Sequence, residues 1–242
     1  MLAEINDFLN NLIWGNILIY LLPALGIFFT ITSRFVQFRY FFKMFNVLRH
    51  TEHDREGHIS SFQALMLSVA GRVGGGNIAG VAVAITLGGP GAVFWMWIIG
   101  LIGMSTSFFE CSLAQLYKEK DGEDSCVYRG GPAYYVTKAL GQRWLGVIIS
   151  VLLMITFGFA FNATQSFIIS TSFEASFDIP TWITGGIVTL IFAIAIFGGV
   201  KRITKFSEII VPVMAMGYLL IAIVVIALNV EKIPTLITMI IE

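Results

Sequence analysis

Six long apolar runs alternate with short polar connections along this chain. A helix needs about 20 apolar residues to cross the hydrocarbon core of a bilayer. Because that core cannot satisfy unpaired backbone groups, runs of this length are expected to be membrane-spanning helices. The pattern predicts an all-α fold, a polytopic membrane helix bundle. The predicted spans cover residues 14–33, 61–87, 92–117, 144–173, 182–200 and 206–230, and a shorter apolar piece covers residues 233–241.

The connections carry most of the polar and charged residues. Between residues 34 and 55, five basic residues are interleaved with phenylalanines and a tyrosine. This mixture predicts an amphipathic helix that lies on the membrane surface. Further along, residues 118–129 form a polar loop, and Gly130-Gly131-Pro132 leads from it into a short amphipathic piece that ends at Leu140.

The second apolar run is interrupted by residues 71–80, which read GRVGGGNIAG. Such a break is tolerated at membrane depth only where the freed backbone faces protein or a watery cavity. We expect two half-helices, residues 61–71 and 77–87, joined by an unwound link at residues 73–76. The alternative is close helix packing, since Gly76-x-x-x-Gly80 is a pair of small residues at the spacing that helix contacts use.

A break of this kind has a defined chemistry. The second half-helix would present free N–H groups and a positive dipole end, which suits a carboxylate. Gly75 and Gly76 have no side chain to block its approach, and Asn77 is a favoured helix cap. The first half-helix would present free carbonyls, which suit a cation. A zwitterionic amino acid taken up with Na⁺ needs both, so the pattern favours a transporter.

Composition agrees with a membrane protein. The chain is 57% hydrophobic and 12% charged with a mean hydropathy of +0.83, whereas soluble domains carry about 25% charged residues. The net charge of zero gives no reason to expect a nucleic-acid partner. Cys111 and Cys126 form neither a disulfide framework nor a metal-binding spacing. The N-terminus lacks the basic region of a cleaved signal peptide.

The basic residues also predict an orientation. Most of the 15 lysines and arginines fall in residues 34–60, 118–143 and 201–205, whereas the alternate connections hold almost none. Positive residues collect on the cytoplasmic side. We therefore expect a multi-pass protein of the plasma (cytoplasmic) membrane, with its N-terminus outside and the 34–60 and 118–143 loops in the cytoplasm.

Residues 74–97 read GGGNIAGVAVAITLGGPGAVFWMW. This block resembles the alanine or glycine:cation symporter family, also called the sodium:alanine symporter family, whose signature is close to G-T-G-N-I-x-G-V-A-x-A-I-x-x-G-G-P-G-A-x-F-W-M-W. Further matches are Gly130-Gly131-Pro132, the FNATQS block at residues 161–166, and the GGVKRI block at residues 198–203. The resemblance implies Na⁺-coupled symport of a small neutral amino acid, alanine or glycine.

The resemblance also implies a LeuT-type fold, in which two inverted five-helix repeats each open with a broken helix. The run at residues 61–87 would be the first of these, with one extra span before it. The family motif of the second repeat, near S-N-E-A-G-x-G-S, is absent from these 242 residues. The chain is therefore expected to correspond to the first repeat, with the second repeat missing.

By this resemblance, the Gly75 and Gly76 amides would hold the substrate carboxylate with Asn77 nearby. The carbonyls of Ala70 and Val73 would supply part of a Na⁺ site. Polar side chains in an apolar helix face the bundle interior, so Asn162 and Gln165 are assigned to the substrate pocket. An interhelical hydrogen bond is the alternative role for that pair.

Two positions depart from the family pattern: Gly75 stands where threonine is usual, and Arg72 where a small residue is common. Because a buried arginine is costly, Arg72 needs a partner or a water path. One hypothesis makes it a tethered cation that partly replaces an ion or binds a carboxylate, and the other makes it an inward salt bridge that locks the closed state. Glu110 is either a proton or gate site or the partner of a basic loop residue.

Other functions fit less well. No Ser/His/Asp arrangement or convergent carboxylate pair suggests an enzyme, and His50, His53 and His58 match no fixed metal spacing. No cofactor is expected besides Na⁺ as the coupling ion. The alternatives that stay open are a truncated, non-transporting membrane scaffold and a proton-coupled amino-acid transporter. The expected partners are a small amino acid, Na⁺ and the lipid bilayer, and the oligomeric state is not predicted.

Overall fold

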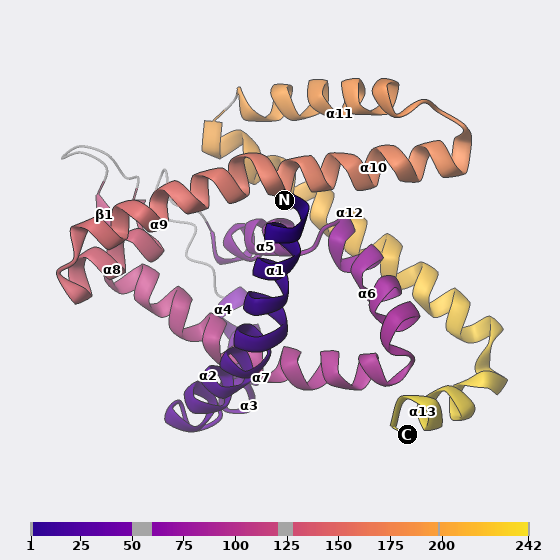
Figure 1. The fold of residues 1–242 in the computed structure, drawn as a ribbon, viewed down its shortest axis with the longest axis horizontal. Coiled ribbons are helices and arrows are strands. Elements are labelled where there is room, and N and C mark those ends of the chain that lie inside the picture. The colour runs from indigo at the N-terminus through magenta and orange to yellow at the C-terminus, as the bar shows by residue number, and fades with distance from the viewer. Residues whose placement is uncertain (1, 50–59, 121–127, 198, 242) are drawn as a thin grey trace. The chain divides into compact units, whose positions relative to one another are not determined.

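The computed structural model describes residues 2–49, 60–120, 128–197 and 199–241 (Figure 1). They form two compact units, Met1–Asn46 with Phe94–Gly146 and Val47–Val93 with Val147–Glu242. Among the described residues, four helices are long and apolar enough to cross a membrane, and a bent pair of shorter helices makes a fifth candidate. The chain is therefore a polytopic helical membrane protein.

The first span of the first unit is longer than the sequence pattern predicts. Helix α1 (Leu2–Asn10), the π-helix η1 (Asn11–Leu18) and α2 (Ile19–Thr32) follow one another, and the apolar span runs over Glu4–Thr32. The predicted start at residue 14 was wrong. Residues 2–10 carry apolar side chains at helical spacing beside two acidic residues, so an amphipathic turn precedes the purely apolar run.

Two left-handed residues end this span. Arg34 (φ 54°) and Phe35 (φ 57°) turn the chain into α3 (Val36–Arg39), which is followed by α4 (Phe41–Arg49). The predicted single amphipathic helix is thus two short helices. They are separated at Tyr40, whose φ of −104° and ψ of 4° fall outside the helical region.

Helix α7 (Gly91–Leu116) packs against α2 through small and polar residues. Ser105 is fully buried and accepts a hydrogen bond from Thr30 Oγ1 at 3.0 Å, while its own Oγ lies 3.0 Å from the Gly26 carbonyl oxygen. A Cβ at Gly26 would collide with Ile102, so glycine permits this approach. Small residues and interhelical hydroxyl bonds are the usual means of helix association in lipid.

The rest of the first unit departs slightly from the all-α prediction. Strands β1 (Glu119–Lys120) and β2 (Tyr128–Arg129) pair antiparallel, and α8 (Pro132–Leu140) follows them. The Lys138 ammonium forms a salt bridge of 2.8 Å to the Glu119 carboxylate, which ties α8 to the hairpin.

The second unit holds the broken helix. Helices α5 (Ser61–Arg72) and α6 (Gly75–Gly88) pack on α12 (Gly199–Leu228) and α10 (Phe161–Phe177) respectively. Figure 1 shows α10 and α11 (Thr181–Ile196) running side by side as a hairpin. The remaining elements are α9 (Arg143–Ile155), within which the first unit ends at Gly146, η2 (Thr156–Ala160), η3 (Val230–Lys232) and α13 (Ile233–Ile241).

Candidate functional site

The second apolar run is interrupted over residues 73 and 74, and the two helices are bent by 47°. Val73 (φ −104°, ψ 107°) and Gly74 (φ −138°, ψ −178°) are extended. The unwound link is therefore two residues long, not the four predicted at 73–76. Gly75 and Gly76 belong to the first turn of α6, because the Asn77 N–H donates to the Gly74 carbonyl at 3.0 Å and closes that turn.

Helix α5 leaves carbonyl oxygens at its end. The N–H of Val73 donates to the Val69 carbonyl at 2.8 Å, and the chain then becomes extended. The last carbonyls of a helix lack intrahelical donors and carry the negative end of its dipole. The carbonyls of Ala70 and Val73, the predicted Na⁺ ligands, lie in this stretch.

Asn77 is not the cap of the second helix. Gly74 occupies the cap position, and the Asn77 side chain crosses the break, where its Nδ2 donates to the Arg72 carbonyl at 2.5 Å. The prediction of a cap was wrong because the helix begins two residues earlier than expected. The amide of Asn77 instead satisfies the end of α5, and it ties the two half-helices together.

Gln165 of α10 reaches the break directly. Its Oε1 accepts a hydrogen bond of 3.0 Å from the N–H of Gly75, and this contact is partly buried. A Cβ at Gly74 would collide with the Gln165 amide nitrogen, and a Cβ at Gly75 would lie 2.9 Å from Ile168 Cγ2. The two glycines thus allow α10 to lie against the interrupted backbone. The Gly75 N–H, which the sequence assigns to a substrate carboxylate, therefore donates to the Gln165 amide oxygen.

The next glycine faces open space. A Cβ at Gly76 would meet no described atom within 4 Å outside its own helix turn. The break is therefore closed by α10 on the side of Gly74 and Gly75 and open beside Gly76. At the start of a helix, the first N–H groups point outward as donors for an anion.

Asn162 is oriented differently from Gln165. Its Nδ2 donates to the carbonyls of Phe157 and Gly158, both at 3.1 Å. These residues belong to the π-helical turn η2, in which the regular helical pairing is lost. The amide therefore satisfies its own helix one turn before Gln165. The interhelical hydrogen bond considered for this pair is made by Gln165 and not, among the described contacts, by Asn162.

Arg72 and Glu110, the two charged residues predicted as gate candidates, lie in different units. Arg72 is the exposed last residue of α5, where the helix dipole favours a cation. Glu110 lies in α7 of the first unit, and its charge acts on Tyr135 of α8. Burial, and secondarily the Glu110 carboxylate, raises the pKa of the Tyr135 hydroxyl above its usual value. Tyr135 was not predicted as the neighbour of Glu110.

A polar contact between α5 and α12 was not predicted from the sequence. The Gln63 side-chain amide donates to the Glu208 carboxylate at 2.9 Å and thereby joins α5 to α12. Gln63 also forms a capping box with Ser60, since each backbone N–H donates to the other's side chain at 3.1 Å. The signal was present in the sequence, because Ser-x-x-Gln before an apolar run is a known helix start.

His50, His53, His58 and Cys126 lie outside the described residues. Within the described ranges, His, Cys, Asp and Glu side chains form no group of three that would hold a metal ion. The predicted Na⁺ ligands are backbone carbonyls of Ala70 and Val73, which form a different kind of site.

Comparison with known proteins agrees with these features. The model of the sodium:alanine symporter family matches residues 1–242. The chain is 46% identical over 233 residues to the amino-acid carrier protein AlsT of Bacillus subtilis, covering 96% of this chain and 49% of that protein. It is 45% identical over 243 residues to the probable sodium/glutamine symporter GlnT of Bacillus subtilis (100% and 50%). It is 39% identical over 228 residues to the sodium/alanine symporter AgcS of Methanococcus maripaludis (91% and 50%).

The chain spans about half the length of the curated relatives that it matches. The family match nevertheless extends over every residue, including the glycine break and the α10 segment that contacts it. The resemblance drawn from the GGGNIAG block is thereby confirmed, and the chain belongs to the sodium:alanine symporter family.

Proposed function

We propose that the protein carrying this chain imports a small neutral amino acid, alanine or glycine, together with Na⁺. The observation that carries the proposal is the hydrogen bond from the Gly75 N–H to the Gln165 amide oxygen. It supports a site at which a helix start binds an oxygen acceptor. A substrate carboxylate offers two such oxygens with a negative charge, which the helix dipole favours further.

In this proposal, the amides of Gly75 and Gly76 bind the carboxylate. The open space beside Gly76 gives the substrate an approach to the helix start, and at Gly75 the carboxylate then displaces the Gln165 amide oxygen from the N–H. Gln165 lies close enough to hold the substrate from the α10 side, and Asn77 keeps the two half-helices in register through the Arg72 carbonyl. Asn162 is assigned to the same pocket as a support, because it stabilises the π-helical turn before Gln165.

Na⁺ is proposed to bind at the end of α5, with the carbonyls of Ala70 and Val73 among its ligands. Hard cations prefer oxygen ligands, and the end of a helix supplies both carbonyl oxygens and a negative potential. Arg72 stands beside these carbonyls, so it acts either as a tethered cation that partly replaces an ion or as a gate. Glu110 is retained as a second gate candidate through its effect on Tyr135.

We propose a LeuT-type fold for the whole protein, with this chain as the first repeat preceded by the extra span Glu4–Thr32. Alternating access would then move one bundle against another around the break between α5 and α6. The proposed location is the cytoplasmic membrane, with the N-terminus outside and the loops at residues 34–60 and 118–143 inside.

Transport by the full-length protein in proteoliposomes tests this proposal. Labelled alanine should accumulate with an inward Na⁺ gradient, and uptake should fall to the level of empty vesicles when K⁺ or choline replaces Na⁺. Equal uptake in all three salts would refute Na⁺ coupling. Uptake that follows a pH gradient instead would identify H⁺ as the coupling ion, an alternative supported by a Bacillus subtilis relative described as a putative sodium/proton-dependent alanine carrier.

Competition by unlabelled amino acids tests the substrate class. Alanine, glycine, serine and glutamine should be compared, because one relative is described as a probable sodium/glutamine symporter. Absence of any uptake under every gradient would favour the second candidate, a non-transporting membrane scaffold.

A further inference from the structure

Two cations lie over one aromatic ring in the first unit. The Arg39 guanidinium carbon is 5.1 Å from the centroid of the Tyr40 ring, and the Lys43 ammonium nitrogen is 5.5 Å from the same centroid. The ring attracts each cation weakly, so Tyr40 helps to hold both positive charges. An anion that contacts both cations would form two charge-assisted contacts.

The ring itself is held in place at the end of two spans. Tyr40 stacks on Phe108 of α7, with centroids 6.5 Å apart and an interplanar angle of 22°. On the other side of the short helix, Gln37 Nε2 donates to Thr30 Oγ1 of α2 at 3.3 Å, and Val36 is buried. The residues that carry the cations are therefore anchored where the candidate membrane span Glu4–Thr32 ends.

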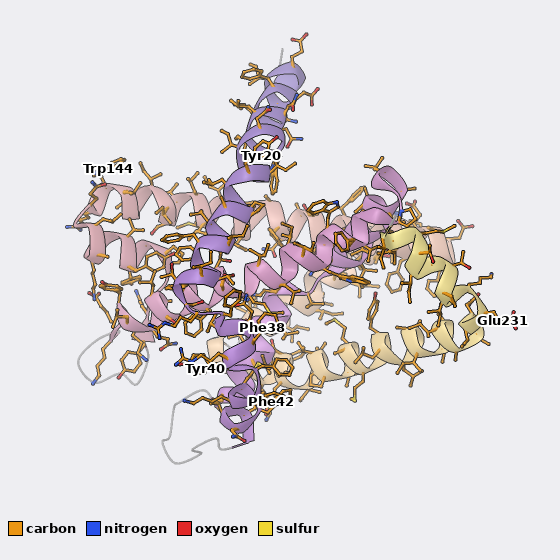
Figure 2. The ribbon with its side chains drawn as sticks, turned by 90° about the horizontal axis from the view of Figure 1, so that it is seen from below. Tyr20, Phe38, Tyr40, Phe42, Trp144 and Glu231 are labelled. Carbon is orange, nitrogen blue, oxygen red and sulfur yellow. The ribbon has the colours of Figure 1, made fainter. Side chains whose placement is uncertain are left out.

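Large apolar side chains surround this position. Phe38 is 65% exposed and Phe42 is 80% exposed, and both are labelled beside Tyr40 in Figure 2. Phe41 packs edge-on against Phe42 and Phe45. Exposed phenylalanines on a short amphipathic helix insert into the boundary between headgroups and acyl chains.

The charge of the segment has one sign. Residues 34–49 contain four basic residues and no acidic residue. Basic residues that directly follow a transmembrane helix attract anionic lipids. A soluble anion would contact the same cations, but it has no acyl chain to pack against the exposed phenylalanines.

We propose that α3 and α4 form a binding site for an anionic phospholipid. The phosphate lies between the Arg39 guanidinium and the Lys43 ammonium, over the Tyr40 ring, and the acyl chains lie along Phe38 and Phe42. The site is independent of the amino-acid site in the second unit. It anchors the segment between the first span and the broken helix to the membrane surface.

The test compares lipids added to the purified full-length protein in a neutral detergent. Phosphatidylglycerol should raise the midpoint of thermal unfolding, whereas phosphatidylcholine should not. The double variant Arg39→Gln/Lys43→Gln should bind phosphatidylglycerol about 25-fold more weakly, since each cation at a membrane surface contributes about a fivefold factor. The matched control is Lys118→Gln/Lys120→Gln, which removes two charges from another connection on the side predicted to be cytoplasmic and should keep the shift.

Three outcomes would overturn the proposal. Equal loss in both double variants would mean that only the overall surface charge matters. An equal shift with inorganic phosphate would mean that no lipid is recognised. If the Arg39/Lys43 variant does not fold, wild-type protein analysed by native mass spectrometry decides: it must retain phosphatidylglycerol over phosphatidylcholine at low salt and lose that preference at high salt. Absence of that preference would contradict the proposed lipid site.

Discussion

At the scale of single residues, the glycines at the break serve two different purposes. Gly74 and Gly75 admit the side chains of α10, since a Cβ on either would meet Gln165 or Ile168. A Cβ at Gly76 would meet no described atom within 4 Å, so its small size leaves space where the proposed substrate would bind. At Gly75, the space that a side chain would need is filled by Ile168 and the Gln165 amide.

Gly74→Ala should impair substrate binding without unfolding the protein. Its backbone angles suit alanine, so the strain is only the collision with the Gln165 amide. That flexible side chain will move away from the break, so Gln165 can no longer hold the substrate from the α10 side. Loss of one such contact to the substrate, of about 1.4 kcal/mol, corresponds to about a tenfold increase in the KM for alanine, measured as Na⁺-driven uptake.

Gly80→Ala is the matched control for this substitution. Unlike a Cβ at Gly74, a Cβ at Gly80 meets no described atom within 4 Å, and alanine favours the helix. Its KM should stay close to that of the wild type. If both variants bind alanine normally, the contact between Gln165 and the break has no part in substrate binding.

Gln165→Glu should inhibit transport more strongly than Gln165→Leu. The carboxylate would remain within reach of the Gly75 N–H, where the dipole of α6 stabilises a negative charge. It would thus compete with the substrate carboxylate, whereas leucine only removes a contact. Uptake and alanine binding should be measured at neutral pH. Thr164→Val is the control, because the Thr164 hydroxyl donates to the Ala160 carbonyl of its own helix. Stronger alanine binding by the glutamate variant would contradict the proposed carboxylate site.

At the scale of elements, the two halves of the broken helix have different neighbours within the second unit. Helix α5 packs on α12, and α6 packs on α10. The Gln63–Glu208 hydrogen bond fixes the first contact, and the Gly75–Gln165 hydrogen bond fixes the second. Because only two extended residues join α5 to α6, each half-helix is positioned by its partner more than by the other half.

Gln63→Leu should destabilise the α5–α12 contact by about 1–3 kcal/mol, because the Glu208 carboxylate would lose its donor in a partly buried position. The measurement is thermal unfolding in nanodiscs. Glu208→Leu should cost a similar amount, whereas Glu208→Gln should cost less, since its amide oxygen still accepts from Gln63.

The capping box complicates this measurement, because Gln63→Leu also removes the acceptor of the Ser60 N–H. Ser60→Ala removes the other half of the box, in which Ser60 Oγ accepts from the Gln63 N–H, and leaves the bond to Glu208; its expected loss of about 1 kcal/mol sets the scale of a capping loss. The double variant Gln63→Leu/Glu208→Leu should cost less than the sum of the two single variants. Additive losses would mean that the two side chains do not interact.

At the scale of the whole molecule, the described helices expose much of their apolar surface. In the second unit Phe197 is 89% exposed and Leu87 86%, and in the first Tyr20 is 75% exposed and Leu116 73%. In water such a surface would drive aggregation, but in a bilayer it is the surface that faces lipid or further helices. The apolar surface therefore agrees with a multi-pass membrane protein in both units.

The proposed orientation can be tested with cysteines already in the chain. With Cys111→Ser, and with any cysteine outside residues 1–242 replaced by serine, Cys126 in the 118–143 loop is the thiol left to label. A membrane-impermeant maleimide should label it only after the cells are permeabilised, because that loop is proposed to be cytoplasmic. Ala3→Cys in a background lacking both natural cysteines should be labelled in intact cells. Labelling of Cys126 in intact cells would reverse the topology.

Local sequence was sufficient for the elements whose signal is local. The apolar runs predicted membrane helices because a bilayer requires long apolar stretches, and the glycine cluster predicted an interruption because glycine neither stabilises a helix nor fills space. Element ends were predicted less well. The first span begins at Glu4 rather than residue 14, and the second half-helix begins at Gly75 rather than Asn77, since hydrogen bonding decides where a helix starts.

The amino-acid sequence by itself determined the class of protein, the family and the place where the second apolar run is interrupted. Only the tertiary structure decided what those groups contact. The Gly75 N–H bonds Gln165, which lies 90 positions away, Gln63 bonds Glu208, and Asn77 caps α5 instead of α6. Periodicity and composition describe a segment alone, whereas these contacts depend on which helices pack together and in which register.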